Sequence, residues 1–104
     1  MITFNAPEKH EITYLEADVN YTIFHLSNGK KVVSSSTLKK YAEDAHMSDF
    51  LRVHKSFLLN PNYITHFTQE GKTGLIKLST GKLLRVSRRR MTMVKRQMIS
   101  RSIL

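Results

Sequence analysis

The sequence contains no cysteine, and features that define several other protein classes are also absent. Without cysteine the chain has no disulfide framework, no cysteine-ligated zinc finger and no thiol for catalysis. No apolar run approaches the roughly 20 residues that are needed to span a bilayer. The N-terminus has neither the basic segment nor the apolar core of a signal peptide. These absences predict a soluble, cytoplasmic protein.

The usual components of an active site are missing as well. The chain has no glycine-rich phosphate loop and no nucleophile–base pair. Its five histidines have no metal-ligand spacing and no carboxylate cluster beside them. Four of these histidines are isolated and receive no predicted role: His10, His25, His46 and His66. We therefore expect no enzyme activity, no catalytic residue, no metal and no cofactor.

Acidic residues are absent from the C-terminal third of the chain. Residues 71–104 contain ten Lys or Arg and no Asp or Glu, whereas residues 1–70 contain seven basic and eight acidic residues. A surface of mixed charge would not separate in this way, so this third is expected to present a positive face to a polyanion. The densest segment, residues 85–90, combines Arg with Ser, the side chains that bind phosphate oxygens and guanine edges. Charge alone leaves a solvated run of cations as the alternative.

The residues that are present predict one folded, mostly β domain over residues 1–104. An apolar share of 40% is too high for a disordered basic tail, and the length suits a single core. Asn28-Gly29 is a strong hairpin signal between two of the predicted strands. Short alternating segments predict strands at residues 12–16, 21–26, 31–34, 64–68, 74–78 and 83–86. Their even spacing favours a sandwich or a barrel-like domain, although the pattern does not show how the strands pair.

Two helices are predicted between and after the strands. Ser36 is expected to cap the first, from about residue 37 to 45, with one face formed by Leu38, Tyr41, Ala42 and Ala45. The second begins after Ser87, and its buried stripe is Met91, Val94 and Met98. Three arginines occupy its first turn, where cations oppose the helix dipole. An external anion such as DNA phosphate would reverse that penalty.

The most specific segment is residues 49–60, in which apolar and polar side chains alternate. Its core-like positions are Leu51, Val53, Phe57, Leu58 and Leu59. Its hydrogen-bonding side chains are Arg52, His54, Lys55 and Ser56. This segment resembles the Phe-x-Arg-x-His-x-Ser-x-x-x-Asn signature of LytTR DNA-binding domains, the output modules of many bacterial response regulators.

Other landmarks of that family follow in the same order. Residues 12–16 and the Asn20-Tyr21 loop resemble its opening strand, and residues 34–45 resemble its linking helix. Tyr63-Ile64 resembles its next strand, and Val86-Ser87-Arg88-Arg89 resembles its closing motif. The resemblance covers about residues 10–100, which is expected to be the core of the domain. Each motif alone is weak, but four of them in order are specific.

The resemblance implies an elongated fold of antiparallel β-sheet, with one or two short helices and a C-terminal helix. It also implies a transcriptional regulator that binds double-stranded DNA sequence-specifically through loops placed in successive major grooves. The implied sites are direct repeats, with weak self-association of the protein away from DNA. The chain has no room for a receiver domain, and Met1 and the length favour a stand-alone regulator. Its control would then depend on expression level, a regulatory protein partner or a homodimer formed on DNA.

Nine residues are predicted to contact DNA, and the resemblance assigns all of them except Arg90, which belongs to the cationic segment 85–90. Asn20 is suited to pair with adenine and Tyr21 with phosphate. Arg88 is placed to contact guanine, and Lys55 reads guanine or phosphate where some relatives have Asn. Arg52 either reaches phosphate or is an ordinary surface residue. The full predicted set is Asn20, Tyr21, Arg52, His54, Lys55, Ser56, Arg88, Arg89 and Arg90.

Two further functions fit the same composition. The basic C-terminal third could bind nucleic acid, including RNA, without sequence preference. Alternatively, its positive face could make the chain a protein-interaction module that docks an acidic or membrane-bound partner, which would not exclude DNA binding. A specific duplex compared with RNA at physiological salt separates the first of these from a sequence-specific regulator.

Overall fold

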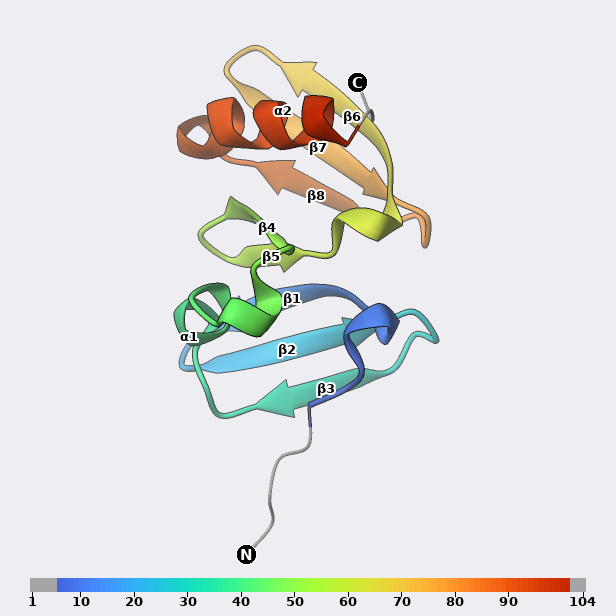
Figure 1. The fold of residues 1–104 in the computed structure, drawn as a ribbon, viewed down its shortest axis with the longest axis vertical. Coiled ribbons are helices and arrows are strands. Elements are labelled where there is room, and N and C mark those ends of the chain that lie inside the picture. The colour runs from blue at the N-terminus through green and yellow to red at the C-terminus, as the bar shows by residue number, and fades with distance from the viewer. Residues whose placement is uncertain (1–5, 102–104) are drawn as a thin grey trace, which may run out of the picture.

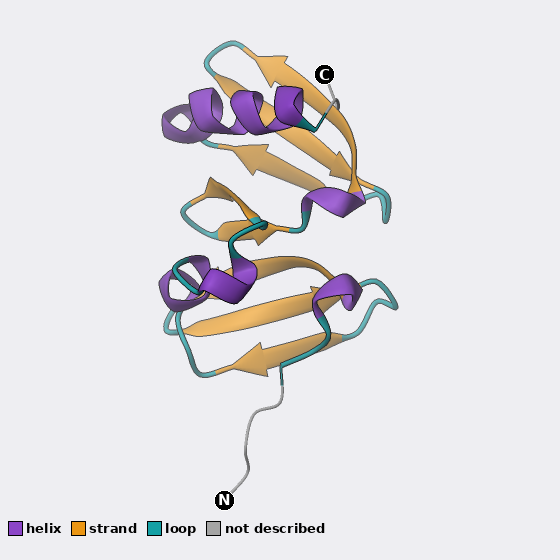
Figure 2. Ribbon diagram, in the orientation of Figure 1, coloured by secondary structure: helices purple, strands orange, loops and turns teal. Residues whose placement is uncertain are grey.

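The computed structural model of the protein describes residues 6–101 and shows an elongated, mostly β molecule with principal extents of 47 × 25 × 22 Å (Figure 1). The strands are β1 (Ile12–Asp18), β2 (Tyr21–Leu26), β3 (Lys31–Ser34), β4 (Leu51–His54), β5 (Phe57–Leu59), β6 (Ile64–Glu70), β7 (Thr73–Leu78) and β8 (Leu83–Val86). The α-helices are α1 (Leu38–Ala42) and α2 (Met91–Ser100). Four 3-10 helices complete the described elements: η1 (Lys9–Glu11), η2 (Ala45–Met47), η3 (Pro61–Tyr63) and η4 (Arg88–Arg90). Figure 2 shows the strands forming both halves of the molecule, with the short helices at their borders.

The strands form two antiparallel sheets that follow one another along the long axis (Figure 1). The first has the order β3-β2-β1-β5-β4, and the second has the order β6-β7-β8. The edge strands β4 and β8 are neighbours, and the backbone N–H of Ser87 donates to the carbonyl of Val53 at 2.9 Å. Neither sheet closes on itself, so the sandwich or barrel suggested by strand spacing is wrong. The elongated antiparallel fold implied by the family resemblance is confirmed.

The hairpin of β4 and β5 lies between two apolar cores. Leu51, Val53 and Leu59 belong to a cluster that is completed by β7, β8 and α2. Leu58 and Phe50 belong to a second cluster formed with β1, β2 and α1. Successive side chains of a strand point to opposite faces, which explains how Leu58 and Leu59 reach different cores. Of the five positions predicted as core, four are buried and Phe57 is half-buried.

Helix α1 is shorter than predicted and has a different cap. The hydroxyl of Thr37, not that of Ser36, accepts the N–H of Lys40 at 3.4 Å. The helix ends at Ala42, because Asp44 accepts the N–H of His46 and begins the separate 3-10 helix η2. Ala45 is therefore exposed and does not continue the buried face of α1.

Helix α2 buries the three residues that the sequence predicts, Met91, Val94 and Met98. It packs closely on β7, where a Cβ built on Gly74 would lie 2.9 Å from the sulfur of Met91. The three arginines before it form the 3-10 helix η4, so they precede the α-helix and do not occupy its first turn. Helix α2 and η4 also contact β4, so η4 is held against both sheets.

One strained residue lies in the turn between β1 and β2. Asp18 pairs with Tyr21, which leaves Val19 and Asn20 as the two turn residues. Val19 has a φ of 55° and is the one non-glycine residue with positive φ in the described part of the chain. A left-handed conformation costs an L-residue of order 1–2 kcal/mol, and a β-branched side chain is a marked outlier there.

Candidate nucleic-acid interface

Three segments that carry predicted DNA-binding residues lie along one long edge of the molecule (Figure 1). They are the β1–β2 turn (residues 18–21), the β4–β5 turn (residues 54–57) and η4, and together we call them the loop edge. Backbone hydrogen bonds hold them in order. The N–H of Ala17, near the first turn, donates to the carbonyl of Ser56 at 2.9 Å. The bond from Ser87 to Val53 connects η4 to the same hairpin.

His54 presents a defined hydrogen-bond donor in the middle of the loop edge. Its Nδ1 accepts the backbone N–H of Ser56 at 3.1 Å, which leaves the proton of the neutral ring on Nε2. Burial lowers the pKa of His54, and the nearby cations Lys55, Arg52, Arg85 and Arg90 lower it further. The ring is therefore neutral at pH 7, and Nε2–H can donate to a base edge or to phosphate.

Arg52 holds the β4–β5 turn. Its Nε donates to the carbonyl of His54 at 2.8 Å, and its Nη2 donates to the carbonyl of Lys55 at 2.6 Å. Two of its N–H groups are thus used inside the protein, which gives Arg52 a role in positioning the turn. Its predicted contact with phosphate stays a prediction. Sequence reasoning missed the positioning role, because a strand pattern does not show which carbonyls lie near a side chain.

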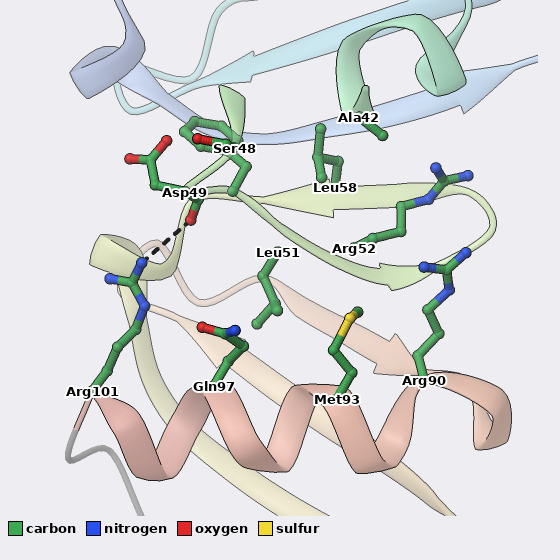
Figure 3. A pocket seen from close by; sticks show the side chains of 11 residues that line it. Ala42, Ser48, Asp49, Leu51, Arg52, Leu58, Arg90, Met93, Gln97 and Arg101 are labelled. Atoms are coloured by element: carbon green, nitrogen blue, oxygen red, sulfur yellow. Dashed lines mark hydrogen bonds between the residues drawn. The ribbon is translucent and has the colours of Figure 1, made fainter. Parts of the chain in front are cut away.

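Arg52 and Arg90 lie at the same end of a cleft between β4 and α2 (Figure 3). The cleft has a volume of about 320 Å³, and Leu51 and Met93 line its middle. Burial lowers the pKa of Arg52, and the like charge of Arg90 lowers it further. The two guanidinium groups therefore concentrate positive charge directly beside the β4–β5 turn.

The cations of the loop edge have no carboxylate partner among residues 6–101. The carboxylates with a basic side chain close by in that range are Asp49 beside Lys9, Glu11 beside His10 and Glu16 beside His25. Lys55, Arg88 and Arg89 are exposed, whereas Arg90 is half-buried. Arg85 is also exposed and close enough to His54 to lower its pKa, although sequence reasoning did not assign it to the site. The signal that could have assigned Arg85 to the site is its place in the cationic segment 85–90.

The β1–β2 turn adds polar groups at one end of the loop edge. Asn20 is exposed, and Tyr21 is 53% exposed. The carboxylate of the nearby Glu16 already has a hydrogen-bond partner, because it lies 2.8 Å from Nε2 of His25. The His25 ring stacks on Tyr14 with centroids 4.1 Å apart. Sequence reasoning treated His25 as isolated, since cross-strand register was needed to bring these side chains together.

This small network is a structural element behind the turn. Burial lowers the pKa of His25 even though Glu16 opposes the shift, so the imidazole is neutral at pH 7. Burial, with a smaller contribution from Glu16, raises the pKa of Tyr14 to about 12. Both aromatic rings therefore stay uncharged at neutral pH.

The asparagine of the central signature is a structural residue. Asn60 is 2% exposed, and its side-chain amide donates to the carbonyl of Ile12 at 3.0 Å. Its side-chain oxygen accepts the N–H of Asn62 at 3.0 Å and so caps η3. Asn60 thereby fixes the end of β5 against the start of β1, which places the β4–β5 turn.

A pair of substitutions at His54 should separate folding from DNA binding. In His54→Asn the side-chain oxygen can still accept the N–H of Ser56, as in an Asx-turn. The amide N–H₂ of the shorter side chain lies nearer the backbone, so no donor reaches the position of Nε2–H. We expect a thermal midpoint close to that of the parent and a DNA affinity reduced by about 1–3 kcal/mol. His54→Ala should lose both the affinity and the turn hydrogen bond. Equal DNA affinity for His54→Asn and the parent would show that Nε2–H makes no contact with DNA.

Within residues 6–101, no group of three or more His, Asp or Glu side chains is arranged to hold a metal ion. In the same range, no helix is both long and apolar enough to cross a membrane.

Comparisons with known proteins bear on the fold and the family. A search of curated proteins found no match. A solved structure matches this one with a TM-score of 0.73 and 22% sequence identity, and the match covers 86% of this chain and 82% of the other. It is the LytTr DNA-binding domain of a Bacillus cereus protein described as a methyl-accepting/DNA response regulator. The family model for the LytTr DNA-binding domain matches residues 7–99. The chain therefore belongs to the LytTR family of DNA-binding domains.

Proposed function

We propose that the protein is a bacterial transcriptional regulator that binds duplex DNA sequence-specifically through the loop edge. The observation that carries this proposal is the arrangement of the three segments along one side, with cations that no described carboxylate neutralises. Membership in a DNA-binding family supports DNA as the ligand, and the loop edge is the surface that we propose for it.

The dimensions support insertion into two successive major grooves. The long axis of the molecule measures 47 Å, and successive major grooves on one DNA face are about 34 Å apart. In this docking mode the β1–β2 turn and η4, at opposite ends of the loop edge, each approach one groove. The β4–β5 turn then lies against the intervening backbone or the near wall of a groove.

Each segment contributes a different kind of contact in this proposal. Arg88 donates two hydrogen bonds to guanine, and Asn20 pairs with adenine. Nε2–H of His54 reaches a base edge or a phosphate oxygen. The remaining predicted residues grip the backbone, which fixes the register without reading sequence. This backbone set is Tyr21, Arg52, Lys55, Ser56, Arg89 and Arg90.

Selection of bound duplexes from a random library tests the proposal. We expect a defined motif, bound about 10³-fold or more tightly than a scrambled duplex at physiological salt. RNA of the same length should bind as weakly as the scrambled duplex. Equal binding to all of these nucleic acids would instead indicate a non-specific binder. No binding to any of them would favour an interaction with an acidic protein partner.

Arg88→Ala should weaken binding to the selected duplex by about 1–3 kcal/mol and relax the base preference at one position. The reason is that Arg88 is exposed on η4 and has no carboxylate partner among the described residues. Lys82→Ala is the matched control, since it removes an exposed cation at the β7–β8 turn on the opposite edge (Figure 1). Binding of Arg88→Ala equal to that of Lys82→Ala would place Arg88 outside the interface.

A further inference from the structure

Val19 combines a strained backbone with an exposed apolar side chain. Its φ is 55°, and its side chain is 88% exposed, the highest value among the exposed large hydrophobic residues of the described chain. The hairpin does not require valine at this position, because glycine or asparagine adopts a left-handed conformation with less strain. Backbone strain of this kind concentrates at functional sites, where an observed outlier justifies a functional hypothesis.

The position of Val19 indicates what it meets. It is one of the two turn residues between β1 and β2, so with Asn20 it projects beyond the paired ends of the strands. Tyr21 follows at once and is also exposed. If the loop edge enters a major groove, the side chain of Val19 is among the first groups to reach the base edges.

The major groove offers one apolar group to such a side chain. The C5 methyl of thymine is the apolar feature of its floor, and the other base-edge groups there are hydrogen-bond donors or acceptors. The isopropyl group of Val19 has no donor or acceptor and suits this methyl. Asn20 beside it is suited to adenine, so neighbouring residues of one turn would read A·T pairs together.

We propose that Val19 is a specificity-determining residue that packs against the methyl group of a thymine in the bound site. The inference rests on the proposed function, because it requires the loop edge to enter the major groove of duplex DNA. A single exposed apolar residue is common on protein surfaces and needs no ligand. The strain at Val19 and its place on the loop edge distinguish it from such a residue.

The test uses the selected duplex with each thymine replaced in turn by deoxyuridine, which removes the methyl and keeps the hydrogen-bonding groups. For the parent protein we expect about a three- to fivefold loss of affinity at one position, the value of one buried methyl group. Val19→Gly should show a similar loss on the thymine duplex and no further loss when that thymine is replaced. The two changes are then non-additive, as expected for groups in contact.

Two controls accompany this comparison of the parent and Val19→Gly on the thymine and deoxyuridine duplexes. The thermal midpoint of Val19→Gly should equal or exceed that of the parent, because the substitution relieves the left-handed strain. Leu83→Asn removes another exposed aliphatic side chain, 52% exposed, at the start of β8 on the opposite edge (Figure 1). The Leu83→Asn variant should bind the thymine duplex with the affinity of the parent protein. It should also lose as much affinity as the parent when the contacted thymine is replaced by deoxyuridine.

Different failures have different meanings. The inference would be overturned, and the proposed function left intact, if no replacement of thymine by deoxyuridine lowered the affinity of the parent protein. The same holds if Val19→Gly lost as much affinity on that replacement as the parent does. An equal loss of affinity by Val19→Gly on every duplex, without methyl dependence, would also overturn it. Failure to bind any duplex would overturn the proposed function and this inference together.

Discussion

Raising the salt concentration from 50 to 200 mM is expected to lower the affinity for the selected duplex by about 10³-fold. About six phosphate contacts predict a slope of log K against log salt near −5, because each contact releases condensed counterions. Lys55 and the three arginines of η4 lie on the loop edge, and Arg52 and Arg85 lie beside it, which makes six cations. Residues 71–104 contain ten basic and no acidic residues, and the loop-edge cations have no carboxylate partner in the described part of the chain.

Titrations of the duplex at several salt concentrations measure this slope. Arg89→Ala should make it less steep by about one unit, since one phosphate contact is lost. Lys82→Ala, on the opposite edge, should leave it unchanged. A slope near zero would contradict a backbone contact of this extent.

Leu59→Ala is expected to lower the free energy of unfolding by about 2–5 kcal/mol, the usual cost of a cavity in a well-packed core. Leu59 is fully buried in the cluster that includes α2, and its neighbour Leu58 is buried in the other cluster. Phe57 is half-buried, so its truncation should cost less than a fully buried phenylalanine would. Chemical denaturation followed by circular dichroism measures the change.

The same experiment tests the domain organisation. Because the β4–β5 hairpin contributes to both clusters, we propose that residues 1–104 form a single domain that unfolds in one transition. Ile99→Ala is the matched control, since Ile99 is 64% exposed and its loss should change stability by less than about 0.5 kcal/mol. Two separate transitions in Leu59→Ala would show instead that the two sheets unfold independently.

Local patterns in the sequence were sufficient to predict most strands. Strands β2, β3 and β8 have the predicted bounds, because each is a short run with β-branched, aromatic or aliphatic residues and lies next to a clear turn signal. The buried stripe of α2 was also predicted correctly from its spacing. The cap of α1 was not, since Ser36 and Thr37 are both good caps and only the backbone decides between them.

The arrangement of the candidate site depends on long-range pairing that local patterns do not contain. β5 pairs with β1, more than 40 residues away, and this pairing sets the β4–β5 turn beside the β1–β2 turn. The order of motifs in the family resemblance assigned candidate residues, but it did not show the contacts among them. The hydrogen bonds of Arg52, the Nδ1 acceptor of His54 and the strain at Val19 all required the backbone geometry.

Hydroxyl-radical footprinting of the selected duplex tests the central proposal most directly. Docking of the loop edge predicts protection on one DNA face over roughly one helical turn per protomer, in two patches about one turn apart. Where two sites occur together, we propose direct repeats, with weak association of the free protein. Arg88→Ala should weaken the patch at one end of each site. A continuous, palindromic footprint of a tight dimer, or protection unaffected by changes on the loop edge, would contradict the account.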